Sequence, residues 1–206
     1  ARGFFQVGFN RRFAPLAIEA KNALAAVGGP RFLMLRVNAG PVPTDSWLHF
    51  LNEGGGRIVG EMCHFIDLAR FFVNASIESV IADTPRSGKD PCDDVSATLR
   101  FEDGSLATVA YTSLGDTSYP KESCEIYAGG TVIALNNFKT LTVTSGGKTR
   151  KSSRGQDKGF KGSLNAFVAA VKSGGPAPID EGELIETSLA TLAVIESLRS
   201  GQRIQL

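Results

Sequence analysis

Apolar residues recur at helical spacing between residues 58 and 73. They occupy positions 58, 59, 62, 65, 66, 69, 72 and 73, so the pattern predicts an amphipathic helix with one buried face. Glycines at positions 54–56 come directly before this run and predict a tight turn that leads into the helix.

The complementary stripe of this helix carries an unusual set of polar residues. Its members lie three or four positions apart and therefore share a face: Arg57, Glu61, His64 and Asp67. A solvated stripe more often carries lysine and glutamate, and this one has no lysine. Its residue types are those that orient and protonate a substrate.

The segments before this helix predict a strand, a helix and a second strand. The strands are expected over residues 4–9 and 31–39, with a helix over residues 16–27 between them. Pro15 suits the first turn of that helix, and Gly28 ends it. This order indicates a crossover connection and a parallel pair of strands. The core candidates of the second strand are Phe32, Met34 or Leu35, and Val37.

After residue 74 the apolar pattern changes to a period of two. It predicts a meander of about six antiparallel strands between residues 77 and 144, with a hairpin turn at Asp103-Gly104. Helices follow over residues 160–173 and 184–200, before a terminal strand. The inward side chains expected for the first of these helices are Leu164, Phe167, Val168 and Val171. The predicted fold class is α+β, a single mostly antiparallel, mixed sheet with helices on one face.

Composition narrows the class of protein. The chain has 206 residues and a formal net charge of +1, which indicates no bulk attraction to nucleic acid or to an acidic membrane. No apolar run reaches the roughly 20 residues that span a bilayer. The cysteines at positions 63, 92 and 124 are too far apart for a close pair, which favours a reducing compartment. We therefore expect a cytoplasmic protein with no nucleic acid or membrane partner.

Four segments in order carry a family resemblance. The main one is Gly-Gly-Gly-Arg-Ile-Val-Gly-Glu-x-Cys-His-Phe-Ile-Asp-Leu at residues 54–68, and the others are residues 7–13, residues 101–105 and Lys121-Glu122. Together they resemble the substrate domain of the glucose–fructose oxidoreductase/inositol dehydrogenase (Gfo/Idh/MocA) family. The sequence departs from that family at Gly60, where inositol dehydrogenase-like members place an aspartate four residues before the histidine.

The resemblance implies a larger parent protein. In the family, the segment at residues 4–9 follows an N-terminal dinucleotide-binding domain, so residues 1–206 are expected to be one substrate domain that lacks a Rossmann domain. The parent would bind NAD or NADP. This chain alone is expected to bind neither, because it has no Gly-x-Gly-x-x-Gly after a strand. The expected partners are a small polyhydroxylated substrate and further copies, as a homodimer or tetramer formed through the open sheet face.

His64 is the candidate catalytic residue, because a neutral histidine can pass a proton near physiological pH. Asp67 lies one turn further along the helix, where it would fix the tautomer of the histidine. Glu61 lies one turn back, where it would accept a hydrogen bond from a sugar hydroxyl. In the structural alternative, His64 is a core histidine with its hydrogen bonds satisfied, and Asp67 pairs with Arg70.

Four further residues are candidates for substrate binding: Arg11, Arg12, Lys121 and Trp47. The two arginines follow the first predicted strand, near the cleft that the resemblance implies, or else form a surface pair. We expect Lys121 and the nearby Tyr119 either to point into the cleft or to lie on an exposed loop. We expect Trp47 either to cover the core or to form a wall of the cleft.

A metal site is not expected. Glu61 and His64 have the spacing of a carboxylate-bridged metal helix. Such a site needs a second Glu-x-x-His pair, and the other histidine, His49, has no such partner.

Three functions remain open from the sequence. The first is the substrate-binding and oligomerisation domain of an NAD(P)-dependent oxidoreductase that acts on a sugar, a polyol or a related hydroxy compound. The second is a non-catalytic ligand-binding or assembly module with the same fold, which the Gly60 departure motivates. The third is a stand-alone lyase or isomerase that uses Glu61 and His64 as acid and base.

Overall fold

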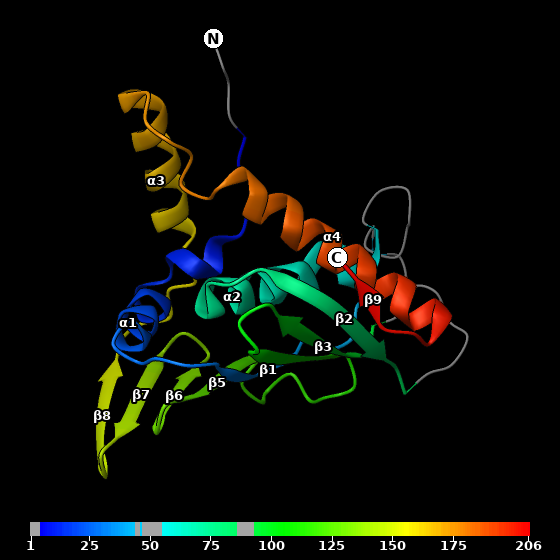
Figure 1. The fold of residues 1–206 in the computed structure, drawn as a ribbon, viewed down its shortest axis with the longest axis horizontal. Helices are drawn as coiled ribbons and strands as arrows, with labels where there is room; N and C mark the ends of the chain where they lie inside the picture. The colour runs from blue at the N-terminus through cyan, green and yellow to red at the C-terminus, as the bar shows by residue number, and fades with distance from the viewer. Residues whose placement is uncertain (1–4, 44–45, 47–54, 86–92) are drawn as a thin grey trace.

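The structure is a computed structural model that describes residues 5–43, 46, 55–85 and 93–206. Figure 1 shows a long sheet with helices gathered beside it. The helical elements are η1 (Asn10–Phe13), α1 (Pro15–Leu24), the π-helical turn η3 (Ile58–Met62), α2 (Cys63–Val73), α3 (Phe160–Ser173) and α4 (Glu181–Ser200). The strands are β1 (Phe32–Asn38), β2 (Ile77–Asp83), β3 (Val95–Phe101), β4 (Leu106–Thr112), β5 (Glu122–Ala128), β6 (Thr131–Asn136), β7 (Thr140–Ser145), β8 (Lys148–Ser153) and β9 (Ile204–Gln205).

The strands form one nine-stranded sheet in the order β8-β7-β6-β5-β1-β4-β3-β2-β9. β1 runs parallel to β4, and the other seven pairings are antiparallel. The α+β class and the mostly antiparallel, mixed sheet are therefore confirmed. The meander is not continuous, because β1 lies between β4 and β5.

The first predicted strand is wrong. Within residues 5–9 the chain makes tight turns, in which Phe9 N–H donates to the Val7 carbonyl at 2.7 Å and Asn10 N–H donates to the Gly8 carbonyl at 2.8 Å. The 3-10 turn η1 follows at once. The predicted parallel pairing exists, but β1 makes it with β4 instead of with this segment.

The predicted core face of β1 is also partly wrong. Leu33, Leu35 and Val37 are buried, whereas Phe32 is 46% exposed and Met34 is 50% exposed. Because side chains alternate along a strand, a shift of one residue exchanges its two faces. The first half of β1, residues 32–35, is apolar on both faces, so its periodicity alone does not identify the buried one.

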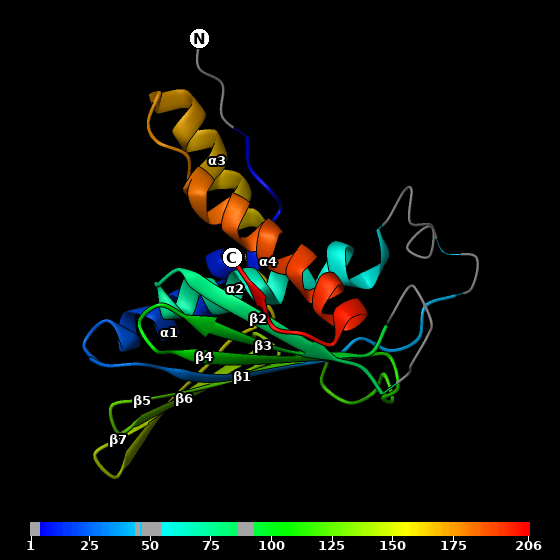
Figure 2. The same ribbon diagram turned by 45° about the vertical axis from the view of Figure 1, so that its right-hand side comes forward.

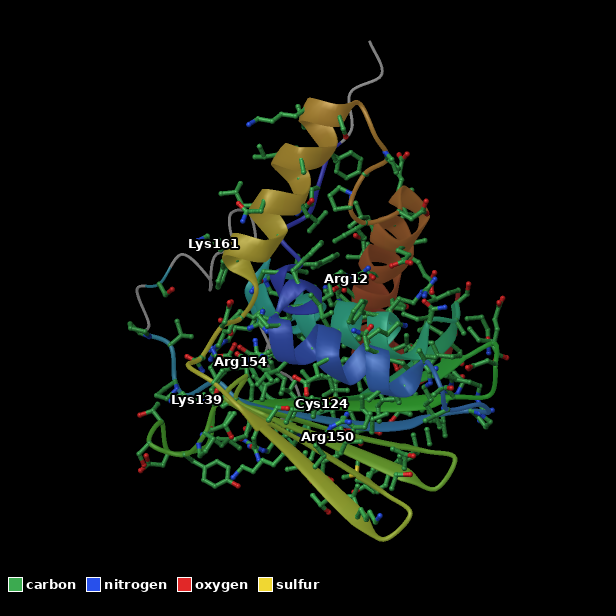
Figure 3. All side chains as sticks on the ribbon, turned by 90° about the vertical axis from the view of Figure 1, so that its left-hand side faces the viewer. Arg12, Cys124, Lys139, Arg150, Arg154 and Lys161 are labelled. Carbon is green, nitrogen blue, oxygen red and sulfur yellow. The ribbon has the colours of Figure 1, made fainter. Side chains whose placement is uncertain are left out.

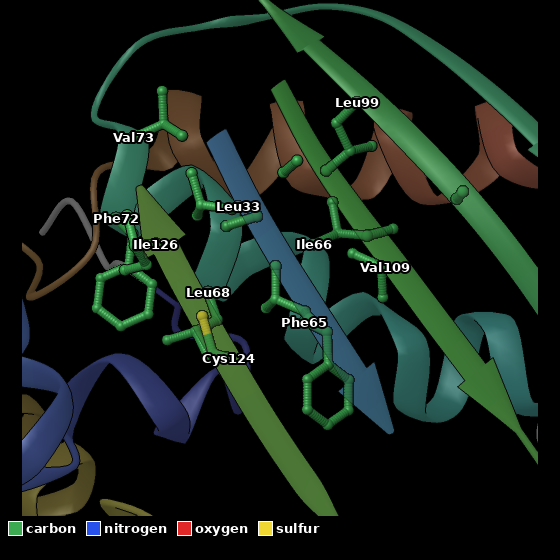
Figure 4. Packing of buried hydrophobic residues seen from close by; sticks show 14 of the residues in the cluster. Leu33, Phe65, Ile66, Leu68, Phe72, Val73, Leu99, Val109, Cys124 and Ile126 are labelled. Carbon is green, nitrogen blue, oxygen red and sulfur yellow. The ribbon is translucent and has the colours of Figure 1, made fainter. Parts of the chain in front are cut away.

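The amphipathic helix after the glycine turn is confirmed and covers the middle of the sheet. Figures 1 and 2 show α1, α2 and α4 on the same side of the sheet. The apolar face of α2 packs against Leu33 of β1, Val109 of β4 and Ile126 of β5 (Figure 4). Burial of each large apolar side chain contributes about 1.5–3 kcal/mol, so this contact fixes the position of the polar stripe on α2.

The bounds predicted for α3 are confirmed, but its predicted inward face is wrong. Leu164 is 63% exposed and Val171 is 56% exposed, and Ser163 is the buried residue of this helix. Figure 3 shows α3 projecting away from the sheet. In the part of the chain that the structure describes, no helix has the length and apolar character needed to cross a membrane.

Candidate functional site

A polar cluster lies where the parallel strands β1 and β4 end, beside the start of α2. Tyr111 is the next-to-last residue of β4, and Glu122 begins β5. Glu61 and His64 project from η3 and the first turn of α2. The carboxyl ends of parallel strands are a common place for ligand sites in sheets, and here they bring four titratable side chains together.

Glu61 is held by three donors. The Tyr111 hydroxyl donates a hydrogen bond to Glu61 Oε2, and Arg57 Nη2 lies 3.3 Å from the same oxygen. Lys121 Nζ lies 3.5 Å from Glu61 Oε1. Arg57 is itself fixed, because its Nη1 donates to the Gly40 carbonyl at 2.6 Å. Burial opposes the charge of Glu61, but the Tyr111 hydrogen bond and the two cations outweigh it and lower the pKa of this carboxyl.

His64 is a neutral imidazole at pH 7. Burial lowers its pKa to about 4, and the nearby positive charge of Arg11 acts in the same direction, against Glu61 and Glu122. Its Nδ1 is buried and has no hydrogen-bond partner among the described residues. The ring of Phe9 meets the imidazole edge to face, with 5.9 Å between the ring centroids. The imidazole is therefore in the form that can accept a proton, and its lowered pKa makes it a weaker base than a solvated histidine.

We expect His64 to titrate near pH 4 in the folded chain, because burial disfavours the imidazolium. Its contribution to stability is fully present above the unfolded pKa of 6.5 and is lost as the pH falls toward about 4. An NMR titration of the imidazole signals, assigned with a His64→Gln variant, measures this pKa. A midpoint near 6.5 would show that the ring is solvated.

Arg12 and Asp67 form a buried ion pair. Arg12 Nε donates to Asp67 Oδ2 at 3.0 Å, and Arg12 Nη2 donates to Oδ1 at 2.6 Å. Arg12 Nη1 also donates to Glu183 Oε2 at 2.6 Å, and the guanidinium lies 5.4 Å from the ring centre of Phe71. Figure 3 shows Arg12 between the N-terminal helices and α4. Burial raises the pKa of Asp67 to about 6, against the attraction of Arg12, so the carboxyl is still ionised at pH 7.

This pairing changes the interpretation of Asp67. Both of its oxygens bind Arg12, so the structure does not place it as the partner that fixes the tautomer of His64. The alternative pairing of Asp67 with Arg70 is wrong as well, because Arg70 Nε binds Glu186 Oε1 at 3.0 Å.

Arg11 points the other way from Arg12. Its Nε and Nη2 each lie 3.1 Å from an oxygen of Glu122. The guanidinium stacks 4.4 Å from the ring centre of Phe65, and Lys158 Nζ donates to Glu122 Oε1 at 2.6 Å. Both arginines are buried. The structure therefore gives them ion-pair partners inside the protein, and neither is the surface pair that the sequence left open.

The remaining candidates differ in their placement. Lys121 joins the cluster, and 35% of its side chain is exposed beside Glu61. Tyr119 lies outside it on an exposed loop, where the guanidinium of Arg36 sits 4.7 Å from its ring centre. Trp47 lies outside the residues that the structure describes.

Sequence reasoning missed Tyr111 as a member of the cluster. It occupies a buried position in the period-two pattern of β4 and is only 2% exposed. A buried tyrosine usually finds a partner for its hydroxyl, so an inward tyrosine near a strand end was the available signal. The sequence does not show that its partner is Glu61, 50 positions away.

The described residues also bear on the metal-ligand spacing and the glycine pattern seen in the sequence. Among them, no group of three or more His, Cys, Asp or Glu side chains is placed to hold a metal. Gly55 and Gly56 have φ angles of 65° and 76°, which makes them turn residues before η3.

Comparison with known proteins establishes the family. A family model described as the GFO/IDH/MocA C-terminal domain matches residues 20–131, more than half of the chain. Myo-inositol 2-dehydrogenase of Thermotoga maritima is 24% identical over 97% of this chain and 63% of its own length. The chain thus spans less than two thirds of this relative.

Solved structures share the fold. An oxidoreductase domain protein from Kribbella flavida superposes with a TM-score of 0.84 at 18% identity, over 97% of this chain and 64% of its own. Levoglucosan dehydrogenase, solved in complex with NADH and levoglucosan, gives 0.81 at 20% identity, over 97% and 65%. The fold is that of the C-terminal domains of oxidoreductases of this kind. The chain belongs to the GFO/IDH/MocA family.

Proposed function

We propose that this chain is the substrate-binding and oligomerisation domain of an NAD(P)-dependent oxidoreductase that acts on a sugar, a polyol or a related hydroxy compound. The observation that carries the proposal is a neutral His64 next to an ionised Glu61, at the carboxyl ends of two parallel strands. Family membership and the relatives named for inositol and levoglucosan support the same class of substrate.

The chemistry of this chain would concern a hydroxyl and its proton. Neutral His64 would accept the proton of the reacting hydroxyl as that carbon is oxidised, and return it in the reverse direction. Proton transfer would pass through Nε2, because Nδ1 is buried. Glu61 would accept a hydrogen bond from the substrate, and Lys121 would donate one. Arg11, Arg12 and Asp67 would support the site through their ion pairs.

The cofactor would bind outside this chain. We infer a preceding dinucleotide-binding domain, since the chain spans 63% of the inositol dehydrogenase and 65% of the levoglucosan dehydrogenase that was solved with NADH. The choice between NAD and NADP would be made there. We place the protein in the cytoplasm, as the cysteine pattern indicates.

Assembly would use the sheet face opposite the helices. Phe32 and Met34 are about half exposed on the central strand of that face. Monomeric proteins seldom leave such apolar side chains uncovered in a group. We therefore propose a homodimer or homotetramer in which two sheets meet.

A spectrophotometric assay of the longer protein tests the proposal. NADH and NADPH formation is followed with myo-inositol and with levoglucosan as substrates. We expect turnover with one cofactor and at least one alcohol. The absence of any nicotinamide reduction, by a protein that binds the nucleotide, would favour the second candidate, a non-catalytic ligand-binding or assembly module. Gly60, in place of the aspartate of inositol dehydrogenase-like members, is the observation that favours this second candidate.

A further inference from the structure

Tyr111 contacts the site through its hydroxyl and its ring. The residue is buried at the end of β4, with Val37 of β1 and Val95 of β3 as its neighbours across the sheet. Its hydroxyl donates to Glu61 Oε2. Arg57 reaches the same oxygen at 3.3 Å, and its guanidinium lies 5.3 Å from the centre of the Tyr111 ring. Two buried side chains thus hold one oxygen of one carboxylate.

The other oxygen of this carboxylate has the longer contact. Glu61 Oε1 has Lys121 Nζ at 3.5 Å, which is longer than an ordinary hydrogen bond. About a third of each of these two side chains is exposed. A hydroxyl that enters here can donate to Oε1 and accept from the ammonium group at the same time. This pair of contacts fits an alcohol better than it fits a carboxylate or a phosphate, which Glu61 would repel.

We propose that Tyr111 and Arg57 are positioning residues that hold Glu61 as an acceptor for a second substrate hydroxyl, so that the site takes a vicinal diol. Glu61 lies in the π-helical turn η3 and His64 in the first turn of α2, close enough for the charge of Glu61 to act on the imidazole. In the proposed arrangement each side chain makes one hydrogen bond to the substrate, to hydroxyls on adjacent carbons. The reacting hydroxyl lies at His64 and its neighbour at Glu61 and Lys121. This inference rests on the proposed function, because it assigns the reacting hydroxyl to His64.

Replacement of Tyr111 by phenylalanine removes the donor and keeps the buried ring. Glu61 then keeps only Arg57 on Oε2 and gains rotamer freedom, so the diol loses its preformed acceptor. A hydrogen bond to a charged group contributes about tenfold or more in affinity. Tyr127→Phe is a matched control, because that hydroxyl binds Glu125 on the exposed sheet face.

An NMR titration of this chain tests the proposal without hydride transfer. The probes are cis-1,2-cyclohexanediol and cyclohexanol, and the signals are the imidazole of His64 and the ring of Tyr111, or the imidazole alone in Tyr111→Phe. We expect the wild-type chain and Tyr127→Phe to bind the diol about tenfold more tightly than the monool. In Glu61→Gln and Tyr111→Phe this preference should fall to about twofold or less, in chains that still unfold cooperatively.

Equal binding of the two probes by the wild-type chain, binding of neither probe, or an undiminished preference in Glu61→Gln would overturn the inference. The proposed function fails separately. If the longer protein is a dehydrogenase but this chain has no preference for the diol, the proposed function holds and the diol inference is wrong. If this chain prefers the diol but the longer protein transfers no hydride, the diol inference holds and the proposed function is wrong.

Discussion

We expect the replacement Arg12→Ala to lower the free energy of unfolding by about 3–5 kcal/mol, the usual cost of removing one partner of a buried ion pair. Asp67 is fully buried, and both of its oxygens bind Arg12. Glu183 would lose the same partner. The variant would keep a desolvated carboxylate without a counter-charge. Denaturant unfolding at pH 7, followed by circular dichroism, measures the difference.

The pH dependence identifies the cause of this loss. Burial raises the pKa of Asp67 to about 6 in the folded chain, from 3.8, so the folded state binds more protons between these values. Its stability contribution therefore falls as the pH rises through that window. Without Arg12 the pKa of Asp67 rises further. The loss of unfolding free energy caused by Arg12→Ala should accordingly be smaller at pH 5 than at pH 7.

Two further variants control the Arg12 experiment. Arg100→Ala removes an exposed arginine of β3 and should change stability by about 0.5 kcal/mol or less. The double variant Arg12→Met/Asp67→Leu replaces the pair by apolar side chains and should recover much of the loss, because no charge is left unpaired. If Arg12→Ala were as stable as Arg100→Ala, the ion pair would contribute nothing.

The local pattern of the sequence was sufficient for the main helix and for most of the sheet. The spacing of apolar residues identified the helix after the glycine turn, and Asp103-Gly104 identified the β3–β4 hairpin. Both depend on interactions within a few residues. The buried face of β1 was predicted wrongly because the first half of the strand is apolar on both faces. The packing of α2 buries Leu33 and leaves Phe32 exposed.

The site was predictable in part, because its residues have partners at different distances along the chain. Glu61 and His64 were found together, since they are one helical turn apart. The directions of Arg11 and Arg12 were not predictable, because their partners lie 55 to 171 positions away. Two neighbouring arginines thus form ion pairs with different elements, and only the tertiary structure shows which partner each one has.

The second large expected effect concerns turnover. We expect His64→Gln to lower kcat of the longer protein by about 10²–10⁴-fold, the range in which a positioned proton-transfer group contributes. Glutamine retains hydrogen-bonding groups but cannot accept the proton. KM should change much less, because Glu61 and Lys121 would still bind the neighbouring hydroxyl. Steady-state kinetics with myo-inositol or levoglucosan, whichever the wild-type protein oxidises, measures both constants.

The pH profile and a neighbouring variant make this prediction specific to proton transfer. Because burial lowers the pKa of His64 to about 4, the histidine is neutral from about pH 5 upward, and its protonation should not limit wild-type kcat in that range. Cys63→Ala changes the adjacent, half-buried residue of α2 and should retain wild-type kcat. Wild-type kcat in a folded His64→Gln protein would remove the histidine from the reaction. Equal losses in both variants would assign the effect to the packing of α2.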